Sequence, residues 1–142
     1  MIRVLFLCTH NSARSQMAEG LLRHRRGMLY ESYSAGTQPR GVNPHAVQVM
    51  AELGIDISHH TSEHVETYIG QAFDLVVTVC DDAKETCPFL PGAARTIHHR
   101  FEDPSSIDGT ETERLAAFRC VRDQIDEWIQ AAFKSADEMM ST

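Results

Sequence analysis

The segment Cys8 to Ser15, CTHNSARS, places a thiol and a guanidinium at a spacing that suits oxyanion chemistry. It fits the pattern C-x5-R-S between an apolar run that predicts a buried strand and a pattern that predicts a helix. Backbone N–H groups of a loop entering a helix converge on one point, where the helix dipole adds positive charge. We therefore expect a tetrahedral oxyanion to bind the loop residues, which are Thr9, His10, Asn11, Ser12, Ala13, Arg14 and Ser15.

Two side chains of this loop would carry the chemistry. Arg14 can donate two parallel hydrogen bonds to an anion, a geometry that lysine cannot match. Cys8, at a helix N-terminus and beside an arginine, should ionise readily and act as a nucleophile. Ser15 can donate a hydrogen bond to the sulfur, and Asn11 tolerates the left-handed backbone that such a loop requires. Elsewhere in a sequence C-x5-R usually has no function, and the flanking strand and helix favour the functional interpretation here.

A pair of cysteines, Cys80 and Cys87, follows a later predicted strand. Cys80 comes directly after the predicted strand over residues 73–79, and neighbouring parallel strands share one functional edge, so Cys8 and Cys80 are expected to lie close together. If residues 81–86 were helical, the Cα atoms of Cys80 and Cys87 would be about 10 Å apart. A disulfide needs roughly 7 Å or less, so its formation would require this segment to unwind. The pair is a candidate redox switch, and two inert thiols are the alternative.

Asp103, Cys120 and three histidines could each have a structural or a functional role. Asp103 precedes a proline and could simply begin a turn, but it becomes the proton donor to a departing oxygen if its loop folds over the anion site. Cys120 is expected to pack in the core as a small hydrophobic residue of the last helix. We interpret His59, His60 and His64 as polar surface rather than metal ligands, because no well-placed carboxylate or thiol accompanies them.

The elements that must position these residues alternate between strand and helix patterns, which predicts a βαβ fold with a parallel sheet. Strands are expected over residues 2–7, 30–35, 73–79 and 95–98. Helices are expected over residues 15–26, from Pro44 with Asn43 as N-cap to a stop at Gly54, and over residues 111–133. We expect a single domain over residues 1–133 and a frayed C-terminal tail over residues 134–142.

Composition narrows the class of protein. The 142 residues are 42% hydrophobic and 23% charged, which is typical of one soluble globular domain. A formal net charge of −7 argues against a nucleic-acid partner, and the basic run over residues 23–26 falls where a helix would end and complements its dipole. The first apolar run is too short for a signal peptide or a membrane span. We expect a cytoplasmic protein without membrane contact, whose cysteines are reactive or buried thiols rather than structural bridges.

The sequence CTHNSARSQMAEG closely resembles the signature of the low-molecular-weight tyrosine phosphatase fold, and within that superfamily the chain is similar to the thioredoxin-coupled arsenate reductases. The similarity continues through YSAGTQPRGVNPHAV, GIDISHHTSE, FDLVVTVCDDAKETCPFLP, HHRFEDPSS and FRCVRDQIDEWI. It implies a flavodoxin-like three-layer α/β fold, with a four-stranded parallel sheet in the order 2-1-3-4 and helices on both faces. It also implies arsenic detoxification by reduction of arsenate, with thioredoxin as reductant and no tightly bound cofactor. We expect a monomer.

The resemblance joins the cysteines into a mechanism. Cys8 would attack arsenate held by Arg14 and the loop amides, while Asp103 protonates the oxygen that leaves. Cys80 would then attack the Cys8 sulfur and release arsenite. Cys87 would attack Cys80 in turn and move the disulfide to an exposed segment that thioredoxin reduces.

The chain departs from this family pattern in its loop and near it. The reductases usually carry Gly at the position of His10, and often a second loop cysteine at the position of Ala13. Glu63 stands where an aspartate is usual. Some relatives bind a potassium ion near the loop, at positions that match Asn11, Glu19, Ser34 and Glu63.

Three alternatives stay open. A low-molecular-weight tyrosine phosphatase would use the same loop with Cys8 and Asp103, but such phosphatases place tyrosines near the acid, where this chain has Ser105 and Ser106. Weak phosphatase activity is also expected of a reductase, because phosphate and arsenate share shape and charge. A reductase recycled by a low-molecular-weight thiol and its redoxin would not need the C-x6-C pair. A non-enzymatic oxyanion or thiol-metal sensor would bind stoichiometrically without turnover.

Overall fold

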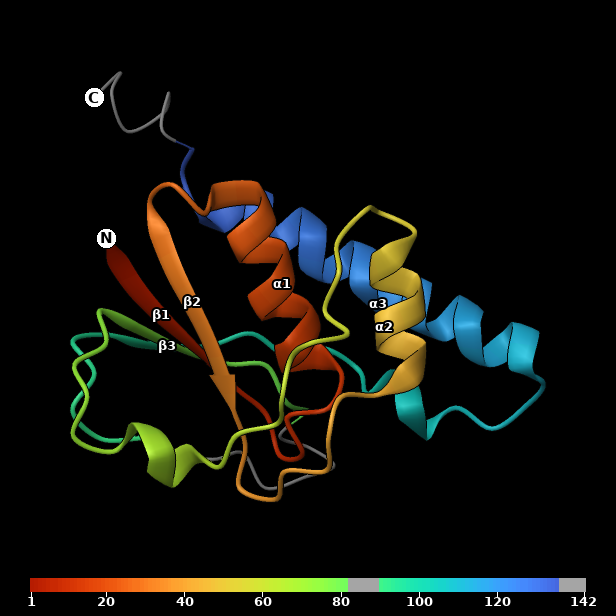
Figure 1. The fold of residues 1–142 in the computed structure, drawn as a ribbon, viewed down its shortest axis with the longest axis horizontal. Helices are drawn as coiled ribbons and strands as arrows, with labels where there is room; N and C mark the ends of the chain where they lie inside the picture. The colour runs from red at the N-terminus through yellow and green to blue at the C-terminus, as the bar shows by residue number, and fades with distance from the viewer. Residues whose placement is uncertain (82–89, 136–142) are drawn as a thin grey trace.

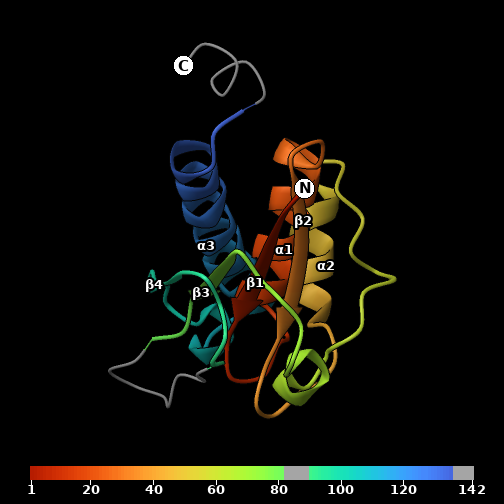
Figure 2. The same cartoon turned by 90° about the vertical axis from the view of Figure 1, so that its left-hand side faces the viewer.

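The computed structural model describes residues 1–81 and 90–135. Its centre is a parallel sheet of four strands, β1 (Ile2–Leu7), β2 (Tyr30–Ala35), β3 (Leu75–Thr78) and β4 (Thr96–His98). The strands follow the order β2-β1-β3-β4, with β1 and β3 in the middle; Figure 1 labels the first three strands and Figure 2 all four. The expected order is confirmed, and β3 and β4 are shorter than their apolar patterns predict.

Helices cover the two faces of the sheet unequally. The helices α1 (Arg14–Arg26), α2 (Pro44–Ala51) and α3 (Glu111–Ala132) lie together on one face, as Figure 2 shows. The short 3-10 helix η1 (Val65–Tyr68) contributes to a smaller core on the opposite face. A second 3-10 helix, η2 (Pro104–Ser106), precedes α3. Every helix within the described ranges is too short or too polar to cross a membrane.

The first strand supplies side chains to both cores. Val4 and Phe6 pack in the larger core under the α-helices, whereas Leu5 and Leu7 pack in the smaller core near η1. All four are completely buried, as expected for a central strand of a parallel sheet. A continuous apolar run therefore anchors β1 firmly and fixes where the chain emerges at Cys8.

Local capping sets the starts of α2 and α3, which the sequence predicts. The Asn43 side chain accepts a hydrogen bond from the His45 N–H at 2.8 Å, with Pro44 as the first residue of α2. A capping box between Thr110 and Glu113 begins α3. That helix ends at Ala132, one residue before the predicted end.

The basic residues at the end of α1 hold the helix to its neighbours. Arg25 donates two hydrogen bonds to Asp126 of α3, at 3.0 and 2.9 Å. Arg26 donates from Nε to the carbonyl oxygen of Phe133 at 3.0 Å, which ties the end of α3 to α1. Phe133 is buried, and the predicted tail beyond it lies outside the described residues except for Lys134 and Ser135.

The predicted burial of Cys120 is wrong. This cysteine is exposed on α3, and its sulfur is a free thiol that faces the Gln124 side chain at 3.6 Å. Phe118, Val121 and Ile125 form the buried face of the helix. At about 100° per residue, Cys120 lies roughly 200° around the helix from Phe118 and so points away from the core.

Candidate active site

Cys8 and Cys80 leave the same edge of the sheet. Leu7 of β1 is paired with Thr78 of β3, and the N–H of Val79 donates to the Leu7 carbonyl at 2.9 Å. Cys8 is the next residue of one strand, and Cys80 follows two residues after the pair on the other. The predicted neighbourhood of the two strand ends is therefore present in the fold.

Three backbone carbonyl groups of the loop from Cys8 to Ala13 point away from its concave side. The carbonyl oxygens of Thr9, His10 and Ser12 accept hydrogen bonds at 2.8, 3.1 and 2.8 Å from backbone N–H groups of residues 38, 40 and 43. Because the N–H and C=O of a trans peptide point in opposite directions, the N–H groups that follow these carbonyls point toward the concave side of the loop. This is the arrangement that binds an oxyanion at a helix N-terminus.

Asn11 has the left-handed backbone that the sequence predicts. Its φ is 48°, and it is the single residue other than glycine with positive φ in the described ranges. His10 does not adopt positive φ, so the loop forms without a glycine at this position. The Asn11 side chain donates to Ser15 Oγ at 2.8 Å and accepts from the Glu63 N–H at 2.8 Å, which fixes the tip of the loop.

Gly36 is a loop-shaping residue that the sequence analysis missed. A Cβ at this position would lie 2.5 Å from the Thr9 carbonyl oxygen and 2.6 Å from that of Cys8. Real Cβ atoms do not come so close to backbone oxygens, so only glycine lets β2 end against the loop. The only sequence signal was a glycine directly after a predicted strand.

Arg14 is buried at the base of the loop. Its side chain is 2% exposed, and Nη1 donates to the carbonyl oxygen of Phe101 at 3.2 Å. The helix that Arg14 begins has no side-chain cap at its N-terminus. The positive end of the helix dipole and a buried guanidinium therefore act on the same place.

Asp103 lies beside that guanidinium, as expected if its loop folds over the anion site. Its Oδ2 is 3.8 Å from Arg14 Nη2, while Oδ1 accepts from the N–H and the hydroxyl of Ser105 at 3.0 and 2.7 Å. The carboxyl group also begins a turn, since it caps η2. The turn is therefore confirmed, and the position beside Arg14 is the one that proton donation requires, while the role of Asp103 as proton donor stays a prediction.

Ser15 is the predicted hydrogen-bond donor to the sulfur of Cys8. Both residues are buried, and Cys8 is a free thiol. Ser15 Oγ accepts the hydrogen bond from Asn11, which leaves its own hydroxyl proton to donate. Cys8 thus begins the loop that leads to the N-terminus of α1, and a hydrogen bond from Ser15 to its sulfur stays a prediction.

The residue after Cys80 forms an ion pair. Cys80 is buried and disulfide-bonded, and the next residue, Asp81, is also buried. Arg100 holds the Asp81 carboxylate with Nε at 2.8 Å and Nη2 at 3.0 Å. Cys87, the third cysteine of the predicted relay, lies outside the described residues.

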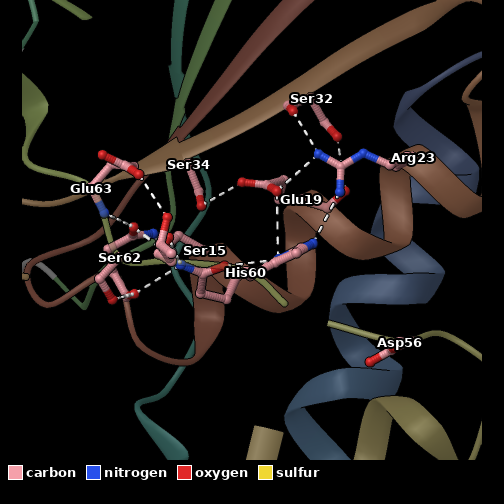
Figure 3. A network of polar contacts seen from close by, with 12 residues as sticks. Ser15, Glu19, Arg23, Ser32, Ser34, Asp56, His60, Ser62 and Glu63 are labelled. Carbon is pink, nitrogen blue, oxygen red and sulfur yellow. Dashed lines mark hydrogen bonds and ion pairs between the residues drawn. The ribbon is translucent and has the colours of Figure 1, made fainter. Parts of the chain in front are cut away.

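A polar network behind the loop connects its tip to α1 (Figure 3). Gln16 Nε2 donates to Asn11 Oδ1 at 3.1 Å, and Gln16 Oε1 lies 3.0 Å from His60 Nδ1. His60 Nε2 lies 3.0 Å from Nη1 of Arg23, and Nη2 of the same arginine donates to Glu19 at 2.9 Å. Because arginine can only donate, Nε2 must accept and Nδ1 must carry the proton that bonds Gln16.

The prediction that His60 is polar surface is wrong. Its side chain is 5% exposed and forms part of this network. Burial lowers the pKa of His60 below 6.5, while the Glu19 charge opposes this shift and the charge of Arg23 reinforces it. His59 is exposed, and His64 caps η1 through a hydrogen bond from the Glu66 N–H at 3.1 Å.

The four residues expected to bind potassium belong to the same network. Ser34 donates to Glu19 Oε1 at 2.7 Å, and Asn11 and Glu63 are joined as described above. Their oxygen atoms are the ligand type that hard cations prefer, so the donor set fits such an ion in kind. Arg23 already supplies a positive charge to Glu19. In residues 1–81 and 90–135, no three His, Cys, Asp or Glu side chains cluster as ligands of a metal ion.

Comparison with known proteins gives the family. A family model described as low molecular weight phosphotyrosine protein phosphatase matches residues 3–141. The chain is 48% identical to the arsenate reductase of Bacillus subtilis over 122 residues, covering 86% of this chain and 88% of the relative. It is 46% identical to that of Halalkalibacterium halodurans over 127 residues, covering 89% and 91%.

Solved structures agree. The arsenate reductase of Archaeoglobus fulgidus superposes with a TM-score of 0.76 at 29% identity, covering 91% of this chain and 97% of that one. A low molecular weight protein tyrosine phosphatase from T. tengcongensis superposes with a TM-score of 0.71 at 25% identity, covering 99% of both chains. Together with the loop from Cys8 to Arg14 and the sheet order, these matches show that the chain belongs to the low molecular weight phosphotyrosine protein phosphatase family.

Proposed function

We propose that this protein is an arsenate reductase that detoxifies arsenic by turning arsenate into arsenite. The observation that carries the proposal is the common origin of Cys8 and Cys80 at the ends of β1 and β3, beside the loop that Arg14 and Asp103 border. A phosphatase needs only one of these two sulfurs. The curated relatives that are named arsenate reductases support the same choice.

The first step would be a substitution at arsenic. Arsenate lies among the loop amides and the Arg14 guanidinium, and the Cys8 thiolate attacks the arsenic atom. One oxygen leaves as water after it takes a proton from Asp103. The product is a covalent Cys8–arsenate adduct, in which arsenic is still in the +5 state.

The second step would transfer two electrons to arsenic. The Cys80 thiolate attacks the Cys8 sulfur, and the electron pair of the sulfur–arsenic bond stays on arsenic. Arsenic leaves in the +3 state as arsenite, and a Cys8–Cys80 disulfide remains. The nearness of the two strand ends supports this transfer.

The third step would move the disulfide to a reductant. The Cys87 thiolate attacks Cys80, Cys8 is released as a thiolate, and a Cys80–Cys87 disulfide forms. Thioredoxin then supplies two electrons and restores both thiols. The C-x6-C spacing favours thioredoxin over a low-molecular-weight thiol with its redoxin, which would need only one exposed mixed disulfide.

A coupled assay tests the relay. NADPH consumption is followed with arsenate, thioredoxin and thioredoxin reductase for the parent and for Cys8→Ser, Cys80→Ser and Cys87→Ser. We expect each of the three changes to abolish multiple turnover. Cys120→Ser is the matched control, because Cys120 is an exposed thiol on α3, and this variant should turn over normally.

The outcomes separate the alternatives. Normal cycling of Cys87→Ser with thioredoxin would exclude the shuttle, and recycling only by a small thiol with its redoxin would assign the other electron source. Activity confined to aryl phosphates, and insensitive to loss of Cys80, would make the protein a tyrosine phosphatase. Weak phosphatase activity beside arsenate reduction agrees with the proposal. Stoichiometric arsenate binding without turnover would indicate a sensor.

We also propose that potassium binds weakly at Asn11, Glu19, Ser34 and Glu63. The oxygens of these residues would hold the ion, which would brace the loop tip through Asn11. Arg23 competes for Glu19, and two cations at one carboxylate repel each other, so the site should be weak. Thermal melting at equal ionic strength in KCl, NaCl and choline chloride tests this. We expect a melting temperature that is higher in KCl than in the other two salts, and we expect Glu63→Gln to remove this difference. Equal melting temperatures in the three salts would exclude the site.

A further inference from the structure

The carbonyl group of Asn11 is held differently from its neighbours in the oxyanion loop. The carbonyl oxygens of residues 9, 10 and 12 each accept from a backbone N–H group, as described above. The Asn11 carbonyl oxygen accepts from two side chains instead. Gln16 Nε2 lies 3.1 Å from it, and Ser62 Oγ, labelled in Figure 3, donates to it at 2.6 Å. Side chains therefore decide where this carbonyl points.

The direction of the Asn11 carbonyl fixes the direction of the next N–H group. All peptide bonds of the described residues are trans, so the Asn11 carbonyl and the Ser12 N–H point in opposite directions. A carbonyl held behind the loop turns the Ser12 N–H toward the concave side, where an oxyanion would bind. Asn11 has a φ of 48°, which is unfavourable for residues other than glycine, so bonds from outside the loop are needed to hold it there.

Gln16 is oriented by its surroundings to donate. It is completely buried near the start of α1, and Nε2 has three oxygen neighbours at 3.1 Å, which are the carbonyl oxygens of Asn11 and Thr61 and Asn11 Oδ1. These oxygens can only accept, so the amide nitrogen must face them and share its two protons among them. At the other end, Oε1 faces the protonated Nδ1 of His60 at 3.0 Å. The amide of Gln16 is thus fixed at both ends.

Ser62 reaches the same carbonyl from a distant part of the chain. It lies 51 residues after Asn11 and is partly buried. The N–H of the following residue, Glu63, donates to Asn11 Oδ1 at 2.8 Å. The backbone and the side chain of Asn11 are therefore both clamped between α1 and the segment over residues 61–63.

We propose that Gln16 and Ser62 are positioning residues for the substrate, which hold the Asn11 carbonyl behind the loop and so aim the Ser12 N–H at the oxyanion. The inference rests on the proposed arsenate site and deepens it by naming what prepares one of its donors. A donor that is already oriented stabilises an anion without the cost of reorganisation. Neither positioning residue touches the oxyanion or exchanges a proton in this role.

The test measures binding of inorganic phosphate, which has the shape and charge of arsenate, to the reduced protein at pH 7.5. The variants are Ser62→Ala, Gln16→Met and the two changes together. Ser62→Ala is the sharper change, because it removes a single hydrogen bond at a partly exposed position and should leave the fold intact. The matched controls are Ser58→Ala and Gln48→Met, which make the same changes at exposed positions.

Two readouts are needed. Calorimetry gives the Kd for phosphate, and ¹H–¹⁵N spectra follow the Ser12 N–H resonance as phosphate is added. We expect Ser62→Ala to raise the Kd about three- to tenfold and Gln16→Met to raise it about tenfold, with the largest rise in the double variant. Phosphate should move the Ser12 resonance in the parent, and this movement should shrink in all three variants. Both controls should behave as the parent does.

A purely structural role for these hydrogen bonds predicts a different result. Urea unfolding would then show a lower free energy of unfolding, while the folded variants would bind phosphate as the parent does. Parental phosphate affinity in Ser62→Ala would therefore overturn the inference. Weaker binding with an unchanged movement of the Ser12 resonance would also overturn it, because the affinity would have been lost elsewhere. If Gln16→Met fails to fold, Ser62→Ala decides alone.

The result is separate from that of the coupled assay. If the parent binds phosphate but does not turn over arsenate, the proposed reductase is wrong, and the phosphate titration still decides the roles of Gln16 and Ser62. If the parent turns over arsenate, kcat/KM for arsenate should fall in Ser62→Ala by about the same factor as the phosphate affinity.

Discussion

Arg14 and Asp103 face each other across 3.8 Å, with the arginine buried and the carboxylate 27% exposed. The arginine lies at the base of the oxyanion loop and the acid lies toward solvent. An oxyanion in the loop would therefore meet a donor of two hydrogen bonds on one side and a proton donor on the other. This arrangement separates binding from proton transfer, so substitutions at the two residues should have different kinetic effects.

Arg14→Lys should weaken oxyanion binding strongly. Lysine keeps the positive charge but cannot donate two parallel hydrogen bonds from a planar group. A hydrogen bond to a charged group contributes about 1.5–3 kcal/mol, so we expect kcat/KM for arsenate to fall roughly 10- to 100-fold. Steady-state kinetics and calorimetric binding of phosphate measure the loss. Binding as tight as in the parent would show that the loop amides alone hold the anion.

Asp103→Asn should slow chemistry without weakening binding. The amide cannot protonate the oxygen that leaves, and general acid catalysis typically contributes about 10²–10⁴ in rate. Phosphate should bind as well as before or more tightly, because a negative charge next to Arg14 is removed. Single-turnover kinetics of the Cys8 adduct test this, with the exposed neighbour Glu102→Gln as control. A parental rate for Asp103→Asn would require another acid.

Gly36→Ala should distort the oxyanion loop. The new Cβ would meet the carbonyl oxygens of Thr9 and Cys8 at about 2.5 Å, so the loop must move. Gly41→Ala is the control, since Gly41 has a φ of 84° and no atom within 4 Å of an added Cβ. Both changes should cost stability, by about 1 kcal/mol or more for the control. Only Gly36→Ala should lose phosphate binding, and retention of binding would refute the close-approach argument.

His60 should make the fold less stable in mild acid. Its pKa is lowered in the folded protein by burial, so the unfolded chain takes up a proton first as the pH falls below 6.5. The stability that neutral His60 contributes is present above 6.5 and is lost as the pH falls through the lowered folded value. Urea unfolding between pH 7.5 and 5 should therefore show a smaller acid loss in His60→Gln than in the parent.

The control for His60 is His24→Gln, which changes an exposed histidine of α1. Its free energy of unfolding should follow the parental pH dependence. If His60→Gln also does so, protonation of His60, whose ring bridges Arg23 and Gln16, does not contribute to the pH dependence of stability.

The elements of the fold were largely predictable because their signals are local. The bounds of β1 and β2 match the apolar and alternating patterns, and Asn43 with Pro44 marks the start of α2. Strand β3 is shorter than its apolar run, although Phe73 and Val79 at the two ends of that run are buried and make backbone hydrogen bonds. Helical spacing alone places Cys120 away from the buried face of α3. The expectation of burial was wrong because it did not take into account the angle between Cys120 and Phe118 around the helix axis.

The sequence by itself determined the oxyanion loop, since Cys8, Asn11, Arg14 and Ser15 follow one another in a stretch whose flanking elements are predictable from periodicity. Only the tertiary structure decided what surrounds that loop. His60 meets Gln16 and Arg23, Gly36 meets the loop backbone, and Arg100 meets Asp81 across long separations in the chain. Such contacts depend on how strands are ordered and how segments return to the sheet edge, and no local pattern of residue types encodes that placement.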